Sequence, residues 1–180
     1  MTHRTRHPRK PRFAESVFPA DVPLLFAMQR AAKLLPAERA GHLAPIQMAF
    51  DAFRRGLGSE AHWRALADAM NLGCELAERH KIARDHLPTF EAGKAALAAV
   101  IERQQAGSSW TLRGTEIADI DLAVFIHKVQ LDYCSRGEFS ATVTTVIARY
   151  RGVLAGQVPA GARVFTTGAS SAATQESAHA

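Results

Sequence analysis

The 180-residue chain has no long apolar run and only two cysteines. A helix that spans a bilayer needs about 18 or more consecutive apolar residues, and no such stretch occurs, so the sequence predicts no transmembrane helix. The basic start is not followed by the apolar segment of a secretory signal. Cys74 and Cys134 lie in segments with helical apolar spacing, as expected for buried thiols in a reducing compartment. The sequence therefore predicts a cytoplasmic protein without a membrane partner.

The motifs that usually accompany catalysis are also missing. The glycines form neither a phosphate-binding loop nor a dinucleotide fingerprint. Cys74, His80 and His86 are spaced at six and six, which does not place two ligands on one helix face, and no C-x-x-C pair supplies half of a zinc site. We therefore expect no metal ion, no cofactor and no catalytic residue, and we predict a non-enzymatic protein.

Two groups of reactive side chains have simpler explanations than chemistry. His127 precedes Cys134 by two helical turns, about 10.5 Å, which is too far for direct proton transfer. We interpret Cys134 as a core residue, and His127 as half-buried and bonded to a neighbour, or as a contact for a partner. Glu116, Asp119 and Asp121 begin a predicted helix, where acids stabilise the N-terminus.

Acidic residues are absent from the first twelve positions, which carry five of the 22 basic residues. The remaining 17 basic residues balance the 17 acidic ones, so the net charge of +5 belongs to this arm and the body is neutral. Basic side chains between prolines give an extended segment that can follow a phosphate backbone or a minor groove. We predict contact with DNA or RNA through Arg4, Arg6, Arg9, Lys10 and Arg12. The alternative is a solubilising tail, or one that meets acidic proteins.

The rest of the chain shows helical apolar spacing. We predict an all-α protein, a single bundle of five or six helices over residues 21–155, between a disordered basic arm (1–20) and a disordered tail (156–180) rich in Gly, Ala, Ser and Thr. Asp21 is the predicted cap of a first helix that Pro36 ends, and a second helix follows Pro45 and stops at Gly56 and Gly58.

The later helices have clearer signals. Ser59 is the predicted cap of a third helix whose apolar stripe comprises Trp63, Leu66, Met70, Cys74 and Ala77. Its outer side carries the pairs Glu60–Arg64 and Glu75–Arg79. Thr89 is the predicted cap of a fourth helix that buries Phe90, Leu97, Val100 and Ile101, and Trp110 is expected to anchor the loop that follows.

Thr115 is the predicted cap of a fifth helix, which is apolar over much of its circumference between Ile117 and Tyr133. Such a helix lies at the centre of a core or against a partner, so we predict that it contacts a host protein or a second copy. A sixth helix runs from about 138 to 154. Because the link is short, we expect it to form an antiparallel hairpin with the fifth.

Four phrases of the sequence support a resemblance: RHPRKPRF, HWRALADAMNLGCELAE, LPTFEAGKAAL and WTLRGTEI…IHKVQLDYCSRGEF. Together they resemble a group of small proteins encoded on proteobacterial prophages and other mobile elements, over roughly residues 6 to 145. The resemblance implies a small accessory protein in a bacterial cytosol, and it implies no activity, cofactor or site residue.

Three functions follow as hypotheses. The first is an accessory or regulatory protein of a mobile element that contacts nucleic acid through the basic arm. The second is a protein-binding effector that inhibits a host regulator or defence complex, which requires an exposed apolar face. The third is an enzyme, which requires a pocket with convergent polar groups.

Overall fold

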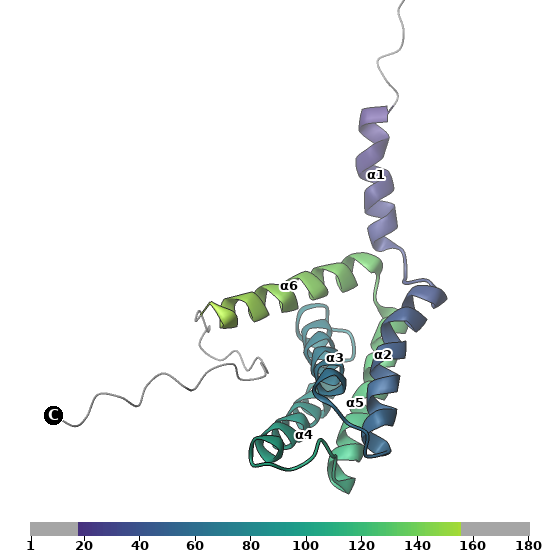
Figure 1. Cartoon of the computed structure of the whole chain (residues 1–180). Helices are drawn as coiled ribbons and strands as arrows, with labels where there is room; N and C mark the ends of the chain where they lie inside the picture. Colours follow the sequence, from purple (N-terminus) through teal and green to yellow (C-terminus); the bar gives the residue numbers. More distant parts are fainter. Residues whose placement is uncertain (1–17, 156–180) are drawn as a thin grey trace, which may run out of the picture.

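The structure is a computed structural model that describes residues 18–155, and only the backbone of residues 18–23. The described chain consists of six α-helices and one 3-10 helix, and contains no β-strand (Figure 1). This confirms the all-α class. The predicted arm and tail fall largely outside the described residues. The elements are α1 (Phe18–Ala31), α2 (Pro36–Arg54), α3 (Glu60–Arg79), η1 (Arg84–His86), α4 (Leu87–Gln105), α5 (Gly114–Tyr133) and α6 (Arg136–Leu154).

The first two helices differ from the predicted boundaries. α1 begins at Phe18 rather than at Asp21, and it ends at Ala31, before Pro36. Pro36 starts α2 instead, because proline is tolerated in the first turn, where the missing N–H has no intrahelical partner. Pro45 lies inside α2, so the predicted start after Pro45 is wrong. Burial of the apolar face of α2 on both sides of Pro45 offsets the cost of the proline; this face comprises Leu43, Ile46, Ala49, Phe50 and Phe53.

Of the caps predicted for α3, α4 and α5, one is confirmed and two are wrong. Ser59 caps α3 as predicted, since its Oγ accepts the N–H of His62 at 3.4 Å. Thr89 and Thr115 are not caps, because α4 and α5 begin one or two residues earlier. Pro88 occupies the first turn of α4, and the carboxylate of Glu116 accepts the backbone N–H of Arg113 at 2.8 Å. A glutamate at the third helical position thus does what a threonine was expected to do.

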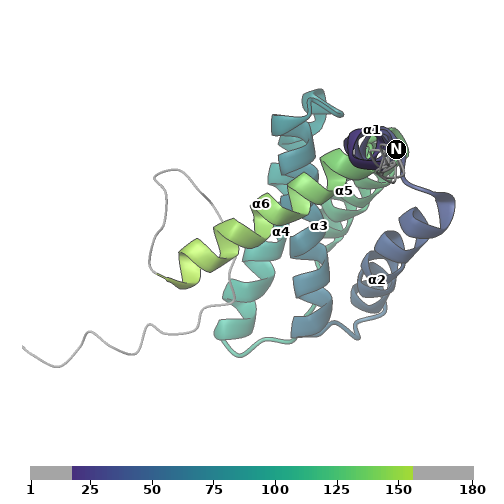
Figure 2. The same ribbon diagram turned by 90° about the horizontal axis from the view of Figure 1, so that it is seen from above.

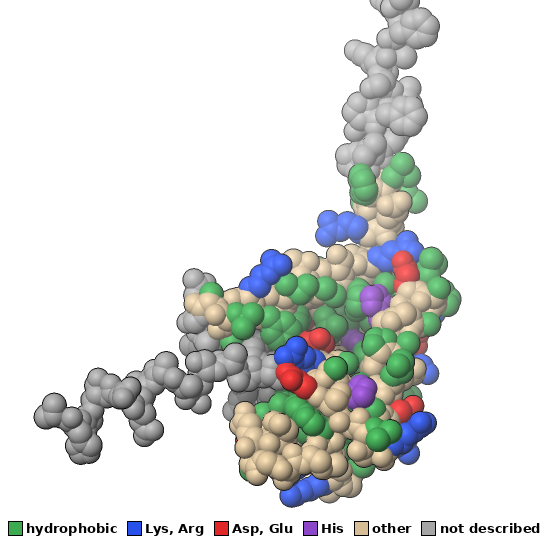
Figure 3. All heavy atoms as spheres, in the orientation of Figure 1, with side chains coloured by type: hydrophobic (Ala, Val, Ile, Leu, Met, Phe, Trp, Pro, Cys, Tyr) green, Lys and Arg blue, Asp and Glu red, His purple; other side chains and the backbone are tan. Residues whose placement is uncertain are grey.

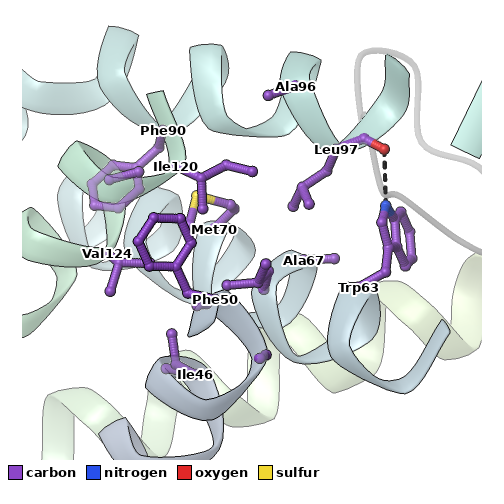
Figure 4. Packing of buried hydrophobic residues seen from close by; sticks show 14 of the residues in the cluster. Ile46, Phe50, Trp63, Ala67, Met70, Phe90, Ala96, Leu97, Ile120 and Val124 are labelled. Carbon is purple, nitrogen blue, oxygen red and sulfur yellow. Dashed lines mark hydrogen bonds between the residues drawn. The ribbon is translucent and has the colours of Figure 1, made fainter. Parts of the chain in front are cut away.

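The main core lies where α3 packs against α2, α4 and α5. The predicted stripe of α3 is entirely buried. Figure 4 shows Met70, Phe90 and Ile120 from three helices meeting in this core, and Trp63 donating its indole N–H to the carbonyl of Leu97 at 2.8 Å. Gly73 permits the close approach of α3 and α4, because a Cβ there would lie 2.2 Å from the Phe90 ring. Trp110 packs against the same core, as expected, from the loop before α5.

α6 does not form the predicted antiparallel hairpin with α5. It turns away at Cys134 and Ser135, crosses the bundle and packs on α3 (Figures 1 and 2). Both linking residues have extended backbones, and Ser135 starts α6 with a capping box in which Glu138 accepts the N–H of Ser135 at 2.7 Å. A second, smaller cluster lies under this corner and includes Leu76, Leu131, Cys134 and Phe139.

Candidate protein-binding surface

α5 has apolar residues on two opposite faces. The residues of its inner face, Ile120, Val124, His127 and Leu131, recur at spacings of four, three and four and are buried. A second set with the same spacings is displaced by two residues, which is roughly half a helical turn. We call this set, Ala118, Leu122, Phe125 and Val129, the outer seam. Leu122 is 51% exposed and Phe125 is 57% exposed, so the outer seam faces away from the core.

The rotation of α5 is fixed by buried hydrogen bonds on its inner face. The side-chain amide of Gln130 donates to the carbonyls of Gly73 and Ile82, at 3.0 and 2.9 Å. Its oxygen lies 3.3 Å from Nδ1 of His127. Burial lowers the pKa of His127 to about 4, so the imidazole is neutral and donates to Gln130. His127 is therefore a core residue, more deeply buried than predicted.

Ion pairs hold both ends of α5. Arg103 on α4 makes a two-pronged contact with Glu116, with N···O distances of 2.6 and 2.7 Å. Burial raises the pKa of Glu116, but Arg103 and the Arg113 backbone N–H outweigh it, and the net shift is downward. Asp132, near the other end, pairs with Arg39 on α2. The acidic residues near the start of α5 therefore differ in their surroundings. Glu116 is buried and holds the start of the helix, whereas Asp119 and Asp121 are exposed.

α1 is the second helix with apolar side chains that no other element of the described chain covers. It projects from the body as a single helix (Figure 1), and Figure 3 shows hydrophobic side chains around its stem. Every described side chain of α1 is exposed, and its large ones are 58–62% exposed: Leu24, Leu25, Phe26 and Met28. Leu24, Ala27, Met28 and Ala31 recur at three, one and three, which places them on one face. We call these four residues, with the flanking Leu25, the α1 seam.

The base of α1 is attached firmly to the corner between α5 and α6. The N–H of Arg136 donates to the carbonyl of Ala32 at 2.8 Å. Lys33 forms a backbone bridge with Ser135, and its ammonium donates to the carbonyl of Tyr133. Gly137 lies so close to α1 that a Cβ would be 2.9 Å from the carbonyl oxygen of Arg30. These contacts direct α1 away from the body, beyond the end of α5 at Tyr133 (Figures 1 and 2).

A polar layer that the sequence analysis missed joins α3 to α6. Tyr150 donates its hydroxyl to Asp68 at 2.8 Å and accepts the Asn71 amide at 2.6 Å. Glu75 was predicted to be on the outer side of α3, but it is 3% exposed and lies 2.6 Å from Arg149, with Arg79 3.8 Å away. The predicted exposed pair Glu60–Arg64 is present, at 2.5 Å. A polar stripe on α3 is the signal that could have revealed this contact: Asp68, Asn71, Glu75 and Arg79.

The remaining candidate residues do not converge on a chemical site. Cys74 and Cys134 are free buried thiols, and burial raises the pKa of each to about 11. Within residues 18–155 no three His, Cys, Asp or Glu side chains are grouped as a metal site. The surface hollow at the start of α3 and the one along α6 each involve essentially one helix, so neither gathers polar groups from several elements.

The predicted nucleic-acid-binding residues, Arg4, Arg6, Arg9, Lys10 and Arg12, lie outside the described residues. The helix predicted between Ile117 and Tyr133 is present as part of α5. One of its faces lies in the core and the opposite face lies on the surface. None of the helices in the described part of the chain combines the length and apolarity that crossing a bilayer requires. Comparison with protein-family models, with curated proteins and with solved structures gave no match.

Proposed function

We propose that this protein works by binding other polypeptides through α1 and the outer seam of α5, without an enzymatic activity. The observation that carries this proposal is α1 itself. It is 14 residues long, its contacts with the body within residues 18–155 are at its C-terminal end, and Leu24, Leu25, Phe26 and Met28 are in solvent. A single helix of about 12–15 residues is marginally stable in water. α1 therefore gains stability mainly when its apolar face is covered.

The size of the exposed apolar surface agrees with this role. Seven large side chains on α1 and α5 are between 51% and 65% exposed: Leu24, Leu25, Phe26, Met28, Leu122, Phe125 and Tyr133. Full burial of such a side chain is worth about 1.5–3 kcal/mol, so covering what is still open on all seven is worth roughly 6–12 kcal/mol. Association costs about 4–15 kcal/mol. The two terms are of similar size, as in a reversible complex.

The cellular role of such binding follows from the resemblance to mobile-element proteins and stays a prediction. An effector that inhibits a host regulator or a defence complex needs an exposed apolar surface and no catalytic centre, and α1 and α5 offer the surface. Contact with DNA or RNA through Arg4 to Arg12 is the second candidate. It is supported by the concentration of five positive charges in the first twelve residues.

Photo-crosslinking in the producing cell tests the protein-binding proposal. We expect benzoylphenylalanine at Leu25 or Phe125 to give covalent adducts with polypeptides, because both positions lie in the proposed contact. The same group at Met48 or Leu57, which are 69% and 68% exposed on other parts of the body, serves as the matched control. Equal adducts at all four positions, or none at Leu25 and Phe125, would show that these faces do not bind protein.

A further inference from the structure

Two apolar helix faces are exposed in the described part of the chain, and the shorter one fits within the length of the longer one. The α1 seam, Leu24 to Ala31, spans about 11 Å at 1.5 Å per residue. The outer seam, extended to the exposed Tyr133, covers Ala118 to Tyr133, about 23 Å of helix. Both faces repeat their apolar residues at three- and four-residue spacings, the pattern by which one helix packs along another. Each face is thus a suitable partner for the other.

α1 cannot reach the outer seam of its own chain. Its base is fixed to Ser135, Arg136 and Gly137, where α5 ends and α6 begins. From there it extends away from α5, roughly in line with it (Figures 1 and 2). Folding back would break the bond between Arg136 and Ala32 and the Lys33–Ser135 bridge. Contact between the two faces therefore requires two molecules.

We propose that two copies of this chain form a dimer in which α1 of each copy packs on the outer seam of α5 of the other. This inference rests on the proposed protein-binding function and names the partner. Because α1 continues beyond the end of α5, a two-fold axis at that end brings each α1 alongside the other copy's α5, running parallel to it. The contact is reciprocal, as in the commonest class of oligomer.

The area involved reaches that of a specific interface. Phe125 and Tyr133 are 57% and 65% exposed. Since a fully covered aromatic side chain buries about 150–250 Å², the four rings of a dimer contribute roughly 500 Å². The aliphatic side chains of the two seams, Leu24, Leu25, Met28 and Leu122, are 51–62% exposed. Counted in both copies, they bring the total to about 1,000 Å², the size at which an interface becomes specific.

Sedimentation analysis of the full chain over a wide concentration range tests the dimer. We expect the mass to approach twice 19.5 kDa. Met28→Glu on α1 and Leu122→Glu on α5 each raise the dissociation constant at least about tenfold, because a charge enters the centre of the contact. Met48→Glu and Leu57→Glu place the same charge on side chains that are 69% and 68% exposed elsewhere, and they leave the constant unchanged.

Mixing two variants tests the reciprocal geometry. The Met28→Glu chain keeps its outer seam, and the Leu122→Glu chain keeps its α1 seam. We expect a mixture of the two to form a heterodimer through one intact contact, at concentrations where each variant alone is monomeric. If the mixture also stays monomeric, the interface pairs α1 with α1 and α5 with α5, and the exchange is refuted.

Other outcomes separate this inference from the proposed function. A chain that sediments at 19.5 kDa at every concentration overturns the dimer. If such a monomer still gives adducts at Leu25 and Phe125 in the cell, the protein-binding function stands with a different partner. If the monomer instead binds phosphatidylserine vesicles and Met28→Glu removes that binding, α1 contacts lipid, and both the dimer and the role of α1 in protein binding are wrong.

Discussion

At the scale of single residues, His127 links the stability of the fold to pH. Its imidazole is 1% exposed and bonded to Gln130, and burial is the main cause of its low pKa, to which His42 adds a smaller repulsion. A folded-state pKa of about 4 lies below the ordinary value of 6.5. Between these values the unfolded chain binds a proton that the folded chain does not. The free energy of unfolding therefore falls as the pH is lowered through this window.

The expected loss is about 2 kcal/mol between pH 7 and pH 5. Urea unfolding at several pH values measures it. His127→Asn preserves a donor near the position of Nδ1 and should be less stable overall, but it should show little of this loss. His86→Asn, at an exposed position, should show the full loss. A pH dependence that is unchanged in His127→Asn would mean that His127 is not the titrating group.

Residue-level signals in the sequence predicted some local features and missed others for physical reasons. The Ser59 cap could be predicted because a serine precedes a clear apolar stripe. The position of Pro45 inside α2 could not be predicted, because a proline inside a helix is costly on its own, and only burial of Ile46 and Phe50 on the core side compensates for it. That compensation depends on tertiary packing, which single-residue preferences do not contain.

At the scale of elements, the contact between α3 and α6 combines apolar and polar parts. Phe139 and Val146 are buried, and the polar layer of Asp68, Asn71 and Tyr150 continues along the same contact. The presence of a helix at α6 could be predicted from its apolar spacing. Its direction could not, because the short link suggested a hairpin, whereas the extended backbone at Cys134 and Ser135 sets a corner.

Tyr150→Phe tests the polar layer. The change removes one hydroxyl that both donates to Asp68 and accepts from Asn71, so two polar groups lose a partner. We expect the free energy of unfolding to fall by about 1–3 kcal/mol. Tyr133→Phe removes the hydroxyl of the other tyrosine, which is 65% exposed, and should change stability little. Equal effects of the two changes would show that the hydrogen bonds of Tyr150 contribute nothing.

At the scale of the whole molecule, the positive charge is concentrated at one end of the chain. Residues 13–180 are electrically balanced, so the net charge of +5 comes from the first twelve residues. This separation could be read directly from the sequence. The two-sided nature of α5 could be read only in part: its apolar circumference indicated a core helix or a partner contact, and the structure shows that Ile120 faces inward while Phe125 faces outward.

Removal of residues 1–12 tests the role of this charge in nucleic-acid binding. We expect the full chain to bind duplex DNA in a gel-shift assay at low salt. The logarithm of its binding constant should fall with the logarithm of the salt concentration with a slope near −4.5, for about five phosphate contacts. The truncated chain should not bind duplex DNA. A chain with Gln at the five basic positions should behave like the truncated one, whereas Gln at Arg54 and Arg55, which are exposed on the body, should not matter. DNA binding by the truncated chain would show that residues after position 12 bind the DNA.

In the proposed dimer α5 uses both of its faces for apolar contacts, and this would restrict which substitutions the gene tolerates. A polar residue at the buried Ile120 disrupts folding, and a polar residue at Leu122 would disrupt the proposed dimer, so selection would act on neighbouring codons for different reasons. Substitutions without effect would then occur mainly at exposed positions between the two apolar faces, such as Asp121 and Lys128. Diverged copies of the gene should therefore vary less in α5 than in α4, which has one face in the core and the other in solvent.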